Sequence, residues 1–169
     1  MSSTRISRHV NAPRAIVYRA IIDPRAVAIW MVPDGMTSEI HEFDPREGGS
    51  FRVSLTYDEP GQPGKTTAHT DTYHGHFAEL VPNEKVEECV EFETTDPEMR
   101  GEMTLTISLS DSDGGTDITA VHEKLPPGLS AADNELGWRM SLDKLAKLVE
   151  GGWTGTTRTP ERESRLSPS

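Results

Sequence analysis

The sequence predicts an α+β fold in which a curved antiparallel sheet wraps around one long C-terminal helix. Three observations predict it: a first segment with the alternation of a strand, two short helical segments directly after it, and a series of strand-like segments that ends in one long helical pattern. The chain has 169 residues, which is the length of one domain with a modest core.

The first strand is predicted at residues 6–10. Ile6, Arg8 and Val10 lie on one face of this segment, and two polar residues separate them. Alternation of this kind is typical of a strand with one buried face.

Two short helices are predicted after this strand. Asn11 is expected to cap the first helix, with Pro13 in its first turn and apolar residues at helical spacing as far as Ile21. Pro24 interrupts the pattern and starts a second short helix, which is expected to end near Trp30.

Six further strands are predicted from alternation and from turn signals between the segments. They are expected at residues 36–43, 51–57, 70–80, 86–92, 101–109 and 116–123. The short connections indicate an antiparallel meander, and the segment at residues 58–65, rich in Pro and Gly, is expected to form a hairpin tip.

The last element changes from the period of a strand to that of a helix. Ser130 followed by Asp133 resembles a capping box, and apolar residues at helical spacing follow as far as Gly151. A helix over residues 131–150 would be about 30 Å long and can cross a whole sheet. We expect one domain over residues 1–152 and a disordered tail over residues 153–169, which has almost nothing to bury.

Composition excludes several classes of partner. The net charge of −11 repels nucleic acid and anionic membrane surfaces. The single cysteine, Cys89, cannot form an internal disulfide, and no apolar run is long enough for a signal peptide or a membrane span. We therefore expect a cytoplasmic protein with neither nucleic acid nor a membrane as its partner.

The order of elements also carries a resemblance to a known family. The chain resembles the START-like SRPBCC superfamily, and within it the homologues of the activator of the 90-kDa heat-shock-protein ATPase. The segments that carry the resemblance are Ala12-Pro13 through Val17-Tyr18-Arg19-Ala20 to Asp23-Pro24 and Trp30, Gly75 to Pro82, Gly115-Thr116 through His122-Glu123 to Leu125-Pro126, and Gly137-Trp138 with Leu142 and Leu145.

The resemblance implies a helix-grip fold, which is START-like and similar to that of the birch pollen allergen. Members of this superfamily bind lipids, plant hormones or polyketides in a cavity under the long helix, and some act as cyclases or aromatases. Larger eukaryotic members carry an additional N-terminal chaperone-binding domain, whereas this sequence begins at the helix-grip strand, so a co-chaperone role is not the first expectation.

The predicted strand faces and the resemblance together give a set of residues expected to line the cavity. These residues share an apolar or aromatic side chain on an inward face, as a hydrophobic pocket requires. The alternative is that they fill a solid core. The set is Trp30, Phe51, Val53, Leu55, Tyr73, Phe77, Val90, Met103, Leu105, Ile118, Trp138 and Leu142.

Two polar residues, Glu88 and His122, fall on the same inward faces. Burial would raise the pKa of the carboxyl, and a nearby imidazole could share its proton, so the two are candidates for general acid and base. The alternatives are contact with a polar atom of a ligand and a purely structural role.

Metal and nucleophile chemistry have little support in the sequence. His74 and His76 share a strand face, but no motif with metal-ligand spacing extends them, so we predict no metal. Cys89 is expected to face outward among carboxylates and to be inert. No phosphate-binding loop or serine elbow is present, and no cofactor is expected.

The leading prediction is therefore binding of a small hydrophobic molecule, such as a lipid or a polyketide, between the sheet and the last helix. Glu88, His122 or Tyr73 would orient its polar end. Two alternatives remain open: a cyclase or dehydratase type of enzyme that uses Glu88 and His122, and an interaction module for a chaperone or another protein.

Overall fold

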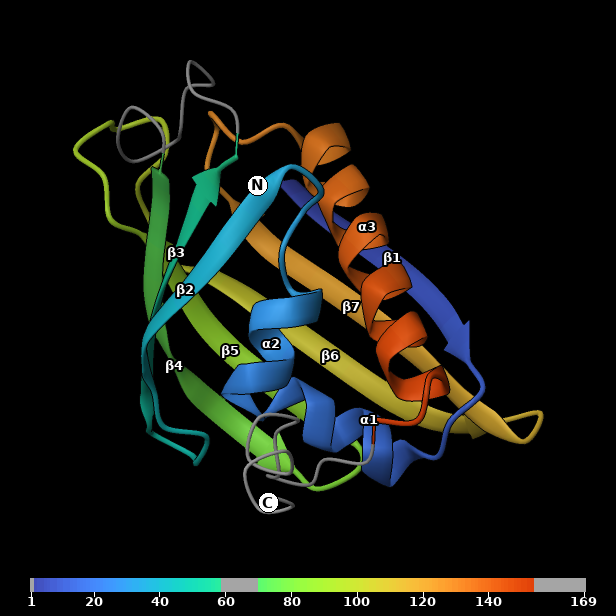
Figure 1. Ribbon diagram of the computed structural model, residues 1–169. Coiled ribbons are helices and arrows are strands. Elements are labelled where there is room, and N and C mark those ends of the chain that lie inside the picture. Colours follow the sequence, from blue (N-terminus) through green and yellow to red (C-terminus); the bar gives the residue numbers. More distant parts are fainter. Residues whose placement is uncertain (1, 59–69, 154–169) are drawn as a thin grey trace, which may run out of the picture.

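The computed structural model describes residues 2–58 and 70–153, and over these ranges it has the predicted helix-grip architecture (Figure 1). Seven strands form one antiparallel sheet in the order β1-β7-β6-β5-β4-β3-β2. The sheet curves around the helices, and α3 lies along its inner side (Figure 1). The elements are β1 (Ser2–Val10), α1 (Arg14–Ile21), α2 (Pro24–Trp30), β2 (Met36–Phe43), β3 (Ser50–Tyr57), β4 (Thr70–Val81), β5 (Lys85–Phe92), β6 (Met103–Ser112), β7 (Gly115–Leu125) and α3 (Ala131–Glu150).

The predicted meander is confirmed, and the strands differ from the prediction mainly at their ends. β1 begins at Ser2, four residues earlier than expected, because its pairing with β7 continues from Val10 opposite Thr116 to Ser2 opposite Leu125. The same pairing extends β7 to Leu125. The edge strand β1 is thus paired with β7 along its whole length.

The prediction that Asn11 caps the first helix is wrong. Pro13 occupies the N-cap position in an extended conformation, and no side chain caps α1. The backbone N–H of Asn11 donates instead to the carboxylate of Glu150 at 2.8 Å. Asn11 therefore connects the end of β1 to the end of α3.

The second short helix begins and ends as predicted. The side chain of Asp23 accepts a hydrogen bond from the backbone N–H of Arg25, with Pro24 in the first turn. Trp30, at the end of α2, is fully buried and donates its indole N–H to the carbonyl of Ala20 at 2.9 Å. This bond fixes the two short helices relative to each other.

The last helix has the predicted bounds. The Ser130 side chain accepts a hydrogen bond from the backbone N–H of Asp133 at 3.2 Å, which satisfies one free donor of the first turn. Its inward face is buried through Leu142, Leu145 and Val149. Burial of this face holds α3 against the sheet and the two short helices.

Two predictions fall outside the described residues. They are the hairpin tip, apart from Asp58, and the tail, apart from Trp153, which is half-buried against the core. The domain boundary at residue 152 stays a prediction. None of the helices in the described ranges is long and apolar enough to cross a membrane.

Candidate functional site

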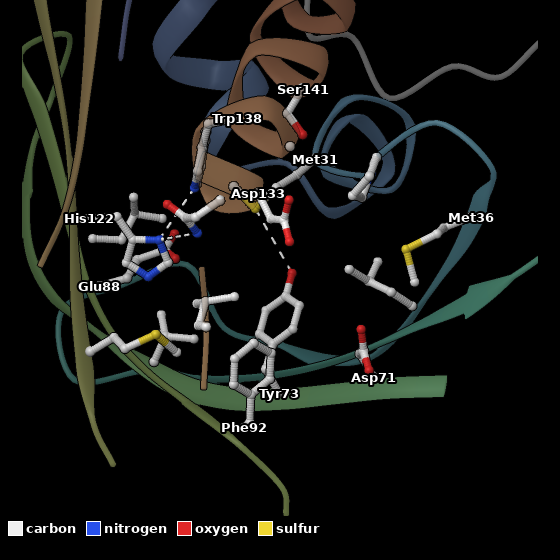
Figure 2. Close-up of a pocket in the computed structure, with 18 residues that line it drawn as sticks. Met31, Met36, Asp71, Tyr73, Glu88, Phe92, His122, Asp133, Trp138 and Ser141 are labelled. Atoms are coloured by element: carbon white, nitrogen blue, oxygen red, sulfur yellow. Dashed lines mark hydrogen bonds between the residues drawn. The ribbon is translucent and has the colours of Figure 1, made fainter. Parts of the chain in front are cut away.

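A cavity of about 190 Å³ lies between the sheet and the first half of α3 (Figure 2). Its wall is formed by strands β2 to β7, by the segments between α2 and β2 and between β7 and α3, and by α3. Most of the wall is apolar. The aliphatic, Phe and Pro side chains in it are Met31, Pro33, Met36, Leu55, Val90, Phe92, Met103, Leu105 and Leu129.

The structure divides the predicted apolar residues into two groups. Half of them are at the cavity wall: Leu55, Tyr73, Val90, Met103, Leu105 and Trp138. The others are buried in the core and are not among the lining residues: Trp30, Phe51, Val53, Phe77, Ile118 and Leu142.

Aromatic packing explains part of this division. The ring of Phe77 packs edge-on against the rings of Phe43 and Phe51, with centroids 5.3 and 5.2 Å apart. Trp30 lies beside Trp138, with ring centroids 6.3 Å apart. These rings fill the space around the cavity, whereas Trp138 itself is at the wall.

The sequence interpretation missed several residues of the wall. Asn134, Gly137 and Ser141 lie on the same face of α3 as Trp138. Helical spacing counted outward from Trp138 would have found them. Met31 lies between α2 and β2, where no sequence period predicts a facing, and Met36 is the first residue of β2, whose inward face the alternation does not define.

The two inward polar residues lie in one row across three strands. Glu88 of β5 is opposite Leu105 of β6, and Leu105 is opposite His122 of β7. The backbones of Glu88 and His122 are therefore two strand spacings, or about 10 Å, apart across the sheet. Both are buried, with exposed fractions of 5 % and 9 %, so the predicted inward facing is confirmed.

Glu88 is a neutral acid in this environment. Burial raises the pKa of its carboxyl from 4.5 to about 8. Within residues 2–58 and 70–153 the carboxyl has no hydrogen bond and no ion pair. The group is therefore held protonated near neutral pH with no partner from this part of the chain.

His122 is held by a chain of hydrogen bonds. The Thr4 hydroxyl donates to Oδ1 of Asn134 at 2.6 Å, which leaves the Asn134 amide to donate to Nδ1 of His122 at 3.1 Å. The indole N–H of Trp138 also donates toward Nδ1, at 3.4 Å. Because Nδ1 accepts both bonds, the ring proton is on Nε2.

Two observations define what His122 can do. Burial lowers the pKa of the imidazole from 6.5 to about 4, so the ring is neutral near neutral pH. Nε2 is enclosed and has no hydrogen-bond partner among the described residues. In this arrangement His122 is a fixed structural group, and its one basic nitrogen is already occupied.

Tyr73 lies between the two ends of the cavity. Figure 2 shows Glu88 and His122 on one side of it, and Asp71 and Met36 on the other. Its hydroxyl contacts the sulfur of Met31 at 3.9 Å. Burial and then the nearby Glu88 carboxyl raise the pKa of the phenol, so it stays protonated.

The histidines on the other face of the sheet have their own contacts. His74 bonds to Glu93 at 3.1 Å. Ligand atoms of His76, Cys89 and Glu102 lie within 4.8 Å of one another. Burial, followed by the carboxylate of Glu102, raises the pKa of the Cys89 thiol, which works against the thiolate that a metal needs.

Comparisons with known proteins agree on the family and the fold. A family model described as activator of Hsp90 ATPase homolog 1-like protein matches residues 11–150. The structure of protein CV1439 from Chromobacterium violaceum is 31% identical, with a TM-score of 0.78, and the match covers 89% of this chain and 99% of that one. A comparison with curated proteins found no match.

More distant structures share the fold. A Rhodobacter sphaeroides protein is 18% identical with a TM-score of 0.71, and the match covers 89% of this chain and 93% of that one. DynU16, from the dynemicin biosynthetic locus, is 22% identical with a TM-score of 0.63. This match covers 92% of the present chain and 49% of DynU16.

Proposed function

The chain belongs to the family of activator of Hsp90 ATPase homolog 1-like proteins, and on that premise we propose that it binds a small hydrophobic molecule between the sheet and α3. The observation that carries the proposal is the apolar cavity itself. Binding would be driven by burial of apolar surface, at about 25 cal/mol per Å². Specificity would come from the few polar groups at the wall.

The size of the cavity limits the part of the ligand that it can enclose. An engineered cavity of about 150 Å³ is known to bind benzene. The present cavity, at about 190 Å³, is slightly larger. We therefore propose a ligand with one ring, two fused rings or a short alkyl chain inside the protein.

The enzyme alternative has weaker support. A cyclase or dehydratase would need a base, but Glu88 is held as an acid and His122 already accepts two hydrogen bonds on Nδ1. The relationship to DynU16, at 22% identity, concerns the fold alone. Binding without turnover is therefore the better account of the site.

The interaction-module alternative also has little support from the described surface. Among the described residues, the large apolar side chains that are exposed are those of Ile29 and Leu136, at 55% and 53%. They lie on two different helices, and single exposed apolar residues are common in folded proteins. The net charge of −11 favours a small-molecule ligand over nucleic acid, and the cytoplasm remains the predicted compartment.

Gly137 offers a direct test of the proposal. It lines the cavity, and a Cβ atom at this position would have nothing within 4 Å. Gly137→Leu should therefore place its side chain in the cavity, because its Cβ atom meets no neighbouring atom. Removing a glycine from a helix is itself favourable by about 1 kcal/mol. Ala132→Leu is the matched control, because it adds the same side chain at an exposed position of α3 that is not at the wall.

The measurement is an NMR titration with 4-phenylbutanol, a neutral probe, read at the indole N–H of Trp138. We expect a saturable shift in the wild-type protein and in Ala132→Leu, and no shift in Gly137→Leu. Native mass spectrometry of freshly purified protein should show a co-purifying molecule that Gly137→Leu lacks. Equal titration curves for all three proteins would contradict the proposal.

A further inference from the structure

We infer that the ligand carries a basic amine, which binds as an ammonium ion to the carboxylate of Glu88. This inference rests on the proposed function and adds to it the chemical class of the ligand's polar end. It is argued from the partners that Glu88 lacks, from the charges at the wall and from the aromatic rings around the cavity.

The carboxyl of Glu88 is the best placed polar group for contact with a ligand. Its side chain is 5% exposed and lines the cavity, yet it has no hydrogen bond or ion pair among the described residues. The enclosed polar atoms without a partner are Oγ of Ser38 and Nε2 of His122, and the oxygens of Glu88 are not among them. The oxygens therefore reach the cavity space. A buried carboxyl of this kind needs a partner, and the ligand is in the position to supply one.

The charges at the wall favour a cation. Three lining residues carry a carboxyl, namely Asp71, Glu88 and Asp133, and no Lys or Arg is among the lining residues of the described chain. The other titratable groups at the wall, Tyr73 from β4 and His122 from β7, are held neutral. Among the described residues of the wall, a carboxylate or phosphate ligand would meet no counter-ion, whereas an ammonium ion would meet Glu88 and Asp133.

The aromatic side chains suit the same ligand. Tyr73, Phe92 and Trp138 are at the wall, and aromatic faces attract cations most strongly when water is excluded. Figure 2 shows the ring of Tyr73 between the Glu88 end of the cavity and its other end. The apolar residues would then take the hydrocarbon part of the amine.

Binding of this kind has a defined proton balance. Near neutral pH the free protein holds Glu88 as a carboxylic acid, because burial raises its pKa. An incoming ammonium ion pairs with the carboxylate, so the O–H bond of Glu88 breaks and its proton goes to the buffer. We therefore expect the release of most of one proton per amine bound at pH 7.

The test compares three probes with the same hydrocarbon: 4-phenylbutylamine, 4-phenylbutanol and 4-phenylbutyrate. Titration calorimetry of the full chain at pH 7, in two buffers with different protonation enthalpies, measures both affinity and proton release. We expect the amine to bind at least tenfold more tightly than the alcohol, and the carboxylate to bind most weakly. Binding of the amine should release a proton, whereas binding of the alcohol or the carboxylate should release none.

Glu88→Gln should weaken amine binding at least tenfold and abolish proton release, with the alcohol unchanged within about threefold. Glu87→Gln is the control, because it removes a carboxyl from the adjacent position on the opposite face of β5. It should leave all three affinities and the proton release as in the wild-type protein.

The outcomes separate the two proposals. Equal binding of amine and alcohol, or an amine affinity that Glu88→Gln leaves unchanged, would overturn the amine inference and leave hydrophobic binding in place. If none of the three probes binds, both the amine inference and the proposal of hydrophobic binding are contradicted. If Glu88→Gln does not fold, the order of affinities of the three probes for the wild-type protein, together with proton release, decides the inference.

Discussion

Replacement of Glu88 by glutamine should remove a pH dependence from the stability of the protein. The pKa of this carboxyl is about 8 in the folded state, against 4.5 for its ordinary value. Between these values the folded protein keeps a proton that the unfolded chain releases. The free energy of unfolding must therefore fall as the pH rises through this window.

The size of the effect follows from the shift. One pKa unit corresponds to about 1.4 kcal/mol, so the shift of Glu88 gives an upper limit of roughly 5 kcal/mol over the whole interval from pH 4.5 to pH 9, of which roughly 2 kcal/mol falls above pH 6.5. His122 acts in the opposite direction at lower pH. Its pKa is lowered from 6.5 to about 4, so stability from this group is present above pH 6.5 and is lost as the pH falls toward 4. The contribution of Glu88 to the free energy of unfolding is therefore best measured above pH 6.5, where that of His122 no longer changes.

The assay is urea unfolding followed by far-UV circular dichroism at intervals from pH 6.5 to pH 9. The wild-type protein and the control Glu87→Gln should lose stability together as the pH rises, while Glu88→Gln should stay nearly constant. Glu88→Gln should become the most stable of the three at the upper end. If the wild-type and Glu88→Gln profiles run parallel, Glu88 is not a buried neutral acid and the reasoning fails.

Three further substitutions test the framework around the site. Gly75→Ala should destabilise the fold by at least about 3 kcal/mol, because a Cβ atom there would overlap the carbonyl oxygen of Cys89; an unchanged melting temperature would contradict this. Ser130→Ala should cost about 1 kcal/mol in urea unfolding through loss of the cap on Asp133, and no loss would mean that the cap is unimportant. Leu145→Ala should cost about 2–5 kcal/mol because the side chain is fully buried, and a cost below this range would indicate that the core collapses into the space.

Elements with local signals were predictable from the sequence. The bounds of α3 were predicted because Ser130 marks its start and Gly151 its end, and both signals act within a few residues. Asn11 also carries a cap-forming side chain, but its backbone N–H bonds to Glu150. That contact joins residues far apart in the sequence, so no local rule could have indicated it.

The site was predictable only in part for a similar reason. Strand alternation placed Glu88 and His122 on inward faces, and both are buried there. It could not separate Leu105 at the wall from Ile118 in the core, because both are inward residues of neighbouring strands. That distinction depends on where α3 crosses the curved sheet.

The hydrogen bond from Thr4 to Asn134 gives the amino end of the chain a role in the cavity. Thr4 lies on β1, is 4% exposed and fixes the amide that holds the His122 ring. A chain shortened to begin at Ile6 would keep every residue of the wall but would free the Asn134 side chain to turn. The imidazole would then keep only the longer hydrogen bond from the indole N–H of Trp138 at Nδ1. A change made outside the cavity would thus loosen one of the groups that form its wall.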